Sequence, residues 1–147
     1  MQIRIVAAGK PALQYAKLGI ADYQKRLSHG GNFEWIIVKA GSREDVSRRL
    51  LAKSEGSFRI AMDERGEVLT TRQFASKMQA LEMRGDVKSV SFIIGAAEGH
   101  TEELRDQCDA ILALSTFTLQ HELALLVLCE QLYRISSLRS GSPYHRD

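Results

Sequence analysis

The chain has 147 residues, 44% hydrophobic and 26% charged side chains and a net charge of +2, which is the size and composition of one soluble globular domain and excludes intrinsic disorder. Its two cysteines are too few for a disulfide framework, no apolar run approaches the roughly 20 residues of a membrane span, and the N-terminal segment lacks the order of a signal peptide. We therefore expect a single domain over residues 1–147, in the cytoplasm and without a membrane partner.

Five short apolar segments have the composition of β-strands and alternate with segments of helical periodicity. The expected strands are Ile3–Ala8, Phe33–Gly41, Phe58–Asp63, Ser89–Gly95 and the segment AILALS at 110–115. The expected helices are residues 11–28, residues 43–54, one from an N-cap at Thr71 to about Met83, a short one from Thr101 and one from about His121 to Leu138. Glu64–Glu67 is expected to form a turn. This alternation predicts an α/β fold, a mostly parallel sheet with helices on both faces.

Three of the expected strands end in segments that suit a ligand site, because ligands of open α/β sheets bind beyond the carboxyl ends of the strands. Met62 and Asp63 end the third strand, Gly95–Gly99 (GAAEG) follows the fourth and Leu114–Leu119 (LSTFTL) follows the fifth. Each segment alone also suits a plain connection to a helix, with Thr118 as a possible cap. No nucleotide-binding glycine motif, nucleophile motif or metal-ligand pattern occurs, so we expect no metal.

The last expected helix contains seven consecutive apolar residues, from Leu123 to Cys129. A helix that is apolar all round is buried on several sides, and the sheet of a small domain covers only one of them. We therefore expect a homodimer with Leu126 and Cys129 at its interface. A central helix in an ordinary core is the alternative.

The charges are distributed unevenly along the chain. Residues 1–60 hold eleven Lys and Arg against five Asp and Glu, a net charge of +6, whereas residues 61–147 hold nine against thirteen, a net charge of −4. A basic half suits phosphate binding, or else an ordinary solvated surface. His29 and His100 show no partner pattern and are expected at the surface.

The chain ends in Tyr144, His145, Arg146 and Asp147, after a Gly-Ser-Pro segment. Terminal residues are often disordered. Tyr, His and Arg together nevertheless offer a hydrogen-bond donor, a titratable base and a planar fork for phosphate. A functional tail and a disordered end are both consistent with this segment.

Two segments carry a resemblance to a known family. IIGAAEG, which ends at Gly99, resembles the IGGPEG signature of the SPOUT-class RNA methyltransferases. The C-terminal segment from Leu114 resembles the block LS…TLPH…EQLYRA…HPYHR of the ribosomal RNA large subunit methyltransferase H family. The resemblance implies a trefoil knot in the C-terminal half, a homodimer, S-adenosyl-L-methionine as cofactor and methylation of N3 of a pseudouridine in 23S rRNA within the ribosome.

The resemblance also assigns roles to individual residues. Cofactor contacts fall on the three strand ends, at Met62, Gly95, Leu114, Ser115, Thr116, Phe117, Thr118 and Leu119. Side-chain chemistry adds the catalytic candidates: His145, by elimination, as the base for the N3 proton, with Arg134 for RNA phosphates and Tyr144 for packing on a base. The substrate-binding candidates are His121 and Arg146.

Five positions depart from the family pattern. Ala96 and Ala97 replace Gly-Pro, Gln120 replaces a Pro, Leu126 replaces an Arg, and Ser142 replaces a His. These departures leave open a second function class, a ribosome- or RNA-binding protein of the same fold without catalytic activity. A flavodoxin-like redox protein is a remoter alternative.

Overall fold

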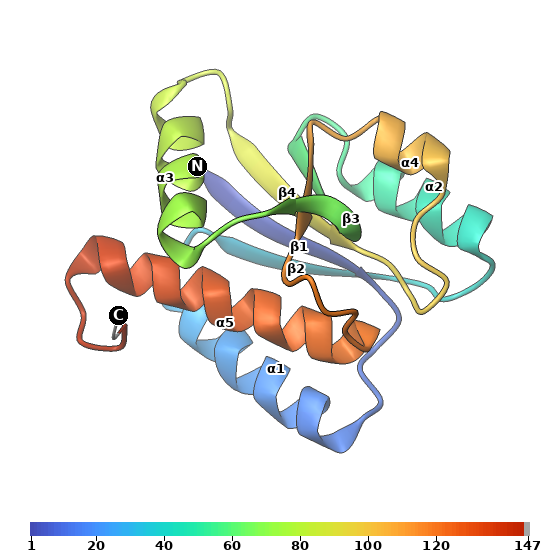
Figure 1. Ribbon diagram of the computed structural model, residues 1–147, viewed down its shortest axis with the longest axis horizontal. Coiled ribbons are helices and arrows are strands. Elements are labelled where there is room, and N and C mark those ends of the chain that lie inside the picture. Colours follow the sequence, from blue (N-terminus) through green and yellow to red (C-terminus); the bar gives the residue numbers. More distant parts are fainter. Residues whose placement is uncertain (146–147) are drawn as a thin grey trace.

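The computed structural model describes residues 1–145, and its centre is a five-stranded parallel sheet with the order β2-β1-β4-β3-β5 (Figure 1). The strands are β1 (Gln2–Ala8), β2 (Phe33–Val38), β3 (Phe58–Val68), β4 (Ser89–Ile94) and β5 (Ala110–Ala113). The helices are α1 (Gln14–Ser28), α2 (Arg43–Lys53), α3 (Thr71–Met83), α4 (Glu102–Asp106) and α5 (His121–Ser140). All six residues of β4 are buried, as expected for a strand in the middle of a covered parallel sheet.

The helices cover both faces of the sheet, which confirms the predicted α/β class. Figure 1 shows α1, α3 and α5 on one face and α2 and α4 on the other. Neighbouring strand residues point to opposite faces, so Ile5 of β1 packs in the core under α1, α3 and α5, whereas Val6 packs in the core under α2 and α4. The trefoil knot stays a prediction. Within residues 1–145, no helix is long and apolar enough to cross a lipid bilayer.

The third strand is longer than predicted. Glu64–Glu67 does not form a turn between elements, because β3 continues to Val68. Met62 and Glu67 both pair with Leu112 of β5, so the four residues between them form a bulge that leaves the hydrogen-bonded ladder and returns to it. A cluster of charged residues with one glycine resembles a turn in the sequence, and only the pairing with β5 reveals a bulge.

Gly66 is the residue that permits this bulge. A Cβ at position 66 would lie 2.6 Å from the carbonyl carbon and oxygen of Ile111 and 2.7 Å from the carbonyl carbon of Leu112. These are backbone atoms of β5 and cannot swing aside. β3 and β5 therefore approach each other so closely at this point that only glycine fits.

Two helix caps lie close to, but not at, the predicted residues. Thr70, not Thr71, caps α3: its hydroxyl accepts from the Gln73 N–H while the Gln73 side chain accepts from the Thr70 N–H, a reciprocal capping box. Gln120, not Thr118, caps α5 and accepts from two backbone N–H groups of its first turn.

Part of the apolar run of α5 is buried within the chain itself: Leu125, Leu128 and Cys129 are buried, and the other four residues are half-buried. Cys129 is 0% exposed, and burial raises the pKa of its thiol to about 12, so its assignment to a dimer interface is wrong. Leu126 lies over Gly19 of α1, where an added Cβ would meet a Leu126 methyl group at 2.8 Å. The sheet, α1 and α3 together cover more of α5 than the sheet alone would.

We predict that Gly66→Ala lowers the free energy of unfolding by about 1–3 kcal/mol, because overpacking against backbone forces β3 and β5 apart. Gly41→Ala is the matched control: its Cβ would meet only the end of the flexible Arg49 side chain, at 2.9 Å. Urea denaturation of both variants measures the difference. Equal stability of the two variants would contradict the close approach at Gly66.

Candidate active site

A cavity of about 660 Å³ opens at the carboxyl ends of β3, β4 and β5, within the size range of small-molecule sites. Its walls come from the β3 bulge, the loop after β4, the loop after β5 and the first turns of α5. Seven of the eight predicted cofactor residues line it: Met62, Gly95, Leu114, Ser115, Phe117, Thr118 and Leu119. Thr116 is the exception and is exposed beside them. The fold thus brings three separate segments together as predicted.

Side-chain hydrogen bonds hold the walls of the cavity in place. The Thr118 hydroxyl donates to Glu64 at 2.7 Å, which ties the loop after β5 to the β3 bulge. Within that loop the Ser115 hydroxyl accepts from the Phe117 N–H at 2.9 Å. The Asp63 carboxylate accepts from the Arg65 N–H at 2.9 Å and so fixes the bulge.

His100 is part of this cavity and not a surface residue, so the sequence-based expectation for it is wrong. It is only 4% exposed, and its Nε2 lies 3.2 Å from the carbonyl oxygen of Ile93, to which it donates in the neutral ring. Its Nδ1 is buried without a hydrogen-bond partner in the described part of the chain. Burial lowers the pKa of His100 below its ordinary value, and the Asp63 carboxylate opposes this only in part.

The His100 ring occupies the space that a side chain at position 95 would need. A Cβ at Gly95 would lie 3.2 Å from Cε1 and Nδ1 of the His100 ring and 3.4 Å from the Gly99 carbonyl oxygen. The glycine therefore lets the loop after β4 fold back on itself, with the imidazole against the Gly95 backbone. This packing places buried Gly95 at the floor of the cavity.

His121 lines the cavity at the start of α5, with its Nδ1 3.1 Å from the Gln120 side-chain nitrogen. The neighbouring Glu122 accepts from the backbone N–H groups of Ala12 and Leu13, at 2.7 and 2.9 Å. Glu122 therefore caps the N-terminus of α1 from a distant part of the sequence. That role is invisible in the sequence, since nothing near Leu13 provides a local cap.

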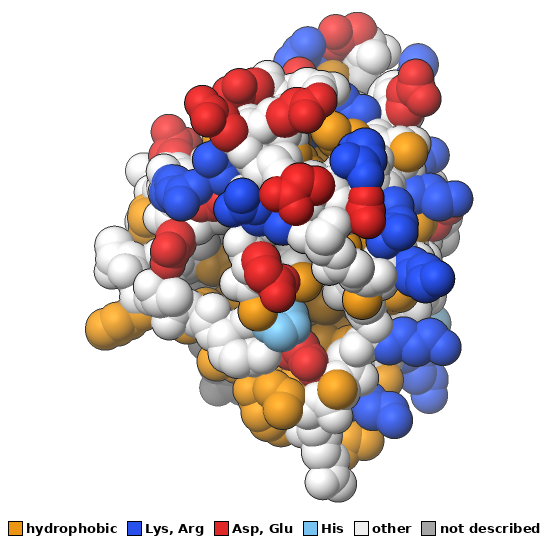
Figure 2. Space-filling view, turned by 90° about the vertical axis from the view of Figure 1, so that its right-hand side faces the viewer, with side chains coloured by type: hydrophobic (Ala, Val, Ile, Leu, Met, Phe, Trp, Pro, Cys, Tyr) orange, Lys and Arg blue, Asp and Glu red, His pale blue; other side chains and the backbone are white. Residues whose placement is uncertain are grey.

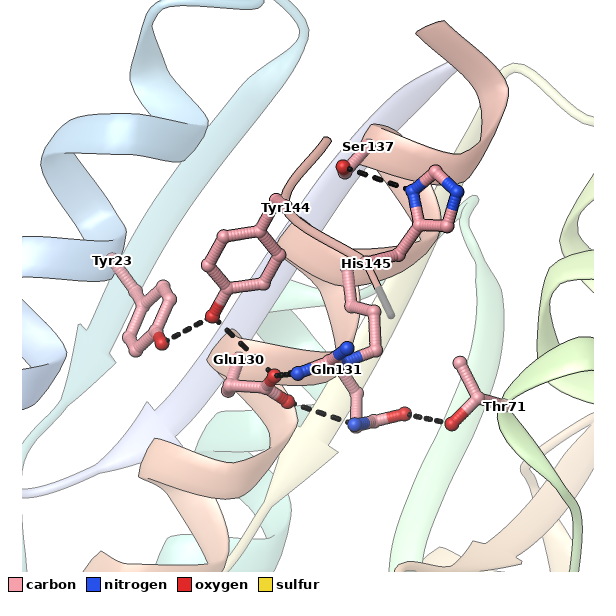
Figure 3. Close-up of polar contacts among 8 residues, drawn as sticks. Tyr23, Thr71, Glu130, Gln131, Ser137, Tyr144 and His145 are labelled. Carbon is pink, nitrogen blue, oxygen red and sulfur yellow. Dashed lines mark hydrogen bonds and ion pairs between the residues drawn. The ribbon is translucent and has the colours of Figure 1, made fainter. Parts of the chain in front are cut away.

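The C-terminal tail folds back onto α5 (Figure 3). The Tyr144 hydroxyl lies 2.5 Å from the hydroxyl of Tyr23 on α1 and 3.4 Å from a Glu130 carboxylate oxygen. The Tyr144 ring stacks edge-on against Tyr133, 4.7 Å between centroids. Burial and the bond to Tyr23 raise the pKa of Tyr144. His145 Nδ1 lies 3.4 Å from the Ser137 hydroxyl, and Arg146 lies outside the described residues.

Arg134 belongs to the same group of contacts. Its Nε donates to Glu130 at 2.9 Å, and its guanidinium lies 5.2 Å from the centre of the Tyr144 ring. Gly141, in the left-handed region at φ 75°, ends α5 and turns the chain back. The structure thus gathers the three predicted catalytic residues, Arg134, Tyr144 and His145, into one cluster, which we call the tail cluster.

The tail cluster and the cavity lie at different ends of α5. His121, at the cavity, precedes Arg134 by thirteen residues, which corresponds to about 20 Å along a helix. No residue of the tail cluster lines the cavity. Within one described chain, the predicted catalytic and cofactor residues therefore form two separate groups.

Several cavity residues escaped the sequence analysis. Arg43, Glu64, Arg65, His100 and Arg105 all line it. Glu64 and Arg65 come directly after a buried strand segment, a position that favours a ligand site. Their assignment to a turn hid this. Among residues 1–145, no group of three or more His, Cys, Asp or Glu side chains is placed to hold a metal ion.

The fold resembles that of solved methyltransferases. A putative methylase family protein from Neisseria gonorrhoeae superimposes with a TM-score of 0.58 at 13% identity, covering 99% of this chain and 87% of that one. A tRNA (m1G37) methyltransferase from Aquifex aeolicus gives a TM-score of 0.52 at 15% identity, covering 91% of this chain and 70% of that one. At such low identity, these likenesses define the fold class alone.

Sequence comparison defines the family. A family model described as "Predicted SPOUT methyltransferase" matches residues 1–145. Ribosomal RNA large subunit methyltransferase H of Thermus thermophilus is 44% identical over 146 residues, covering 99% of each chain, and that of Stenotrophomonas maltophilia is 34% identical over 157 residues, again covering 99% of each. The chain therefore belongs to the SPOUT methyltransferase family, in the branch of the ribosomal RNA large subunit methyltransferases H.

We predict that His100 titrates below the ordinary histidine pKa of about 6.5, because its burial disfavours the charged ring. As the pH falls below that value, the unfolded chain takes up a proton that the folded chain does not, so stability decreases. NMR titration of the His100 ring and urea denaturation between pH 7 and pH 5 test this. The prediction fails if His100 titrates at or above 6.5, or if His100→Phe keeps the same dependence of stability on pH.

Proposed function

We propose that this protein is an S-adenosyl-L-methionine-dependent methyltransferase that methylates N3 of a pseudouridine in 23S rRNA. The name shared by its full-length relatives supports this. The observation that carries the proposal is the cavity, because it unites residues from three strand ends that the family motif assigns to the cofactor. Since the substrate is ribosomal, we infer that the protein works in the cytoplasm.

The cavity suits an adenosyl compound. Its floor is the buried, side-chain-free Gly95, and apolar walls come from Met62, Leu114 and Leu119. The residues that would hold the group are Met62, Gly95 and Leu114–Leu119. When bound, S-adenosyl-L-methionine supplies a methyl group already activated by the sulfonium sulfur. The work left to the protein is to align N3 with that methyl group and to remove the N3 proton.

His145 is the proposed base for that proton, because an imidazole nitrogen can accept a proton that lies within hydrogen-bond reach. Tyr144 would pack on a base, and Arg134 and Arg146 would hold RNA phosphates. His121, at the cavity, would orient the substrate or the cofactor loop. In the described chain Arg134 is held by Glu130 and by the Tyr144 ring, so the tail cluster arranges these groups before RNA binds.

We further propose that the protein works as a homodimer. The distance of about 20 Å along α5 between the cavity and the tail cluster supports a site in which one copy supplies the cavity and its partner the tail cluster. Tyr15 and Leu18 of α1 are 52% and 64% exposed and lie one turn apart, so they share a face. We assign the contact between copies to this face. The trefoil knot belongs to the same proposal.

Transfer of a labelled methyl group from S-adenosyl-L-methionine to 70S ribosomes, followed by mapping of the modified base, tests the function. We expect one modified pseudouridine in 23S rRNA. Ribosome binding without methyl transfer, and without cofactor binding in calorimetry, would instead indicate the non-catalytic RNA-binding protein.

We predict that Leu18→Asp shifts the protein from dimer to monomer, because a carboxylate at an apolar interface would be buried unpaired. Light scattering after size-exclusion chromatography measures the mass. Met83→Asp is the control, since Met83 is 79% exposed at the far end of α3 and lies outside the proposed interface. A Leu18→Asp protein that remains dimeric would show that this face is not the interface.

We predict that His145→Ala lowers methyl transfer by about 10²–10⁴-fold, the usual contribution of a general base. Its affinity for S-adenosylhomocysteine should stay within about twofold, because His145 is outside the cavity. Ser136→Ala, at an exposed position near the end of α5, is the control. Full activity of His145→Ala in a single-turnover assay would remove His145 as the base.

A further inference from the structure

The excess of positive charge in the first 60 residues has a definite place in the fold. β1 and β2 are parallel neighbours whose last residues, Ala8 and Val38, are paired. The Gly9 N–H donates to the Val38 carbonyl oxygen at 2.9 Å, so the segments that follow β1 and β2 leave the sheet side by side. Lys10 and Lys39 follow directly and are both exposed, which places two cations side by side at the carboxyl edge of the sheet.

Two arginines of α2 extend this group toward the cavity. Arg49 donates from Nη1 to the carbonyl oxygens of Lys39 and Ala40, at 3.0 and 3.3 Å, and thereby holds the loop that carries Lys39. Arg43, the first residue of α2, is exposed and lines the cavity. We call Lys10, Lys39, Arg43 and Arg49 the basic strip. Figure 2 shows Lys and Arg side chains gathered along one edge of this face of the molecule.

The two lysines are free to bind an external anion. Among residues 1–145, neither the Lys10 nor the Lys39 ammonium group forms an ion pair, whereas on α2 Arg43 is paired with Glu44 and Arg48 with Asp45. Exposed, unpaired cations repel one another at close range. A chain of phosphates passing over them would relieve that repulsion and release its counterions.

The cavity wall itself carries mixed charges. Glu64, Glu98 and Glu102 line it and are exposed, as is Arg65, and Arg105 is directed to Asp63 at 3.8 Å. A polyanion that approaches the cavity is therefore attracted more strongly to the unpaired lysines of the basic strip than to this wall. The charge distribution selects one path of approach.

We propose that the basic strip binds the phosphates of the RNA segment next to the methylated base, so that the RNA backbone reaches the cavity across the ends of β1 and β2. The proposal rests on the proposed function, because it needs RNA as the substrate. It adds the path of the RNA and the residues that contact its phosphates.

The test is the double variant Lys10→Gln/Lys39→Gln, with binding to 70S ribosomes measured between 50 and 200 mM salt at constant magnesium. Each lost phosphate contact lowers the slope of log K against log salt by about 0.7–0.9, so we expect the slope to fall by about 1.4–1.8. The affinity at low salt should fall about tenfold or more, since each contact there contributes several-fold. Affinity for S-adenosylhomocysteine should not change.

The matched control is Lys77→Gln/Lys88→Gln, which removes the same charge from α3 and from the amino end of β4, away from the cavity. The proposed role of the basic strip is refuted if the Lys10→Gln/Lys39→Gln variant keeps the wild-type salt slope. It is also refuted if the control variant loses as much slope and affinity as this variant does. If the wild-type protein neither binds ribosomes nor methylates them, the proposed function itself fails. The unchanged cofactor affinity separates these outcomes from misfolding.

Discussion

The parallel pairing of β3 with β4 on one side and β5 on the other is the constraint on which the site depends. Parallel neighbours end at the same edge of a sheet, so this strand order brings Met62, Gly95 and Leu114 together from three distant parts of the sequence. The bulge after Met62 then moves charged side chains out of the ladder and into the cavity wall. Gly66 makes that possible, because no side chain fits against the β5 backbone.

The long helix α5 connects the two groups of predicted functional residues and also keeps them apart. Its first turn borders the cavity, and its last turns carry Arg134 and the docked tail (Figure 3). The helix is held by the sheet, by Leu126 on Gly19 of α1, and by Glu122, which caps α1. Such a firmly held helix cannot bend to bring its two ends together, so a site that needs both ends requires a second copy of the chain.

Sequence reasoning was successful where local patterns decide the structure. The strand and helix order and the two-sided α/β class followed from apolar periodicity, and seven of the eight residues predicted to contact the cofactor line one cavity. It failed where distant contacts decide. His100 has no local pattern that reveals burial, Cys129 is covered by elements far away in the chain, and the β3 bulge exists only through its pairing with β5.

The central claim, a site shared between two copies, is tested most directly by complementation. Ala97→Trp blocks the cavity from an exposed lining position, and His145→Ala removes the proposed base. Each variant alone should transfer almost no methyl group to ribosomes. Co-expression with two different tags yields mixed dimers, in which one of two shared sites has both an open cavity and an intact tail. Isolated mixed dimers should therefore recover about half of the wild-type activity. Mixed dimers as inactive as their parents would show that each chain builds its site alone.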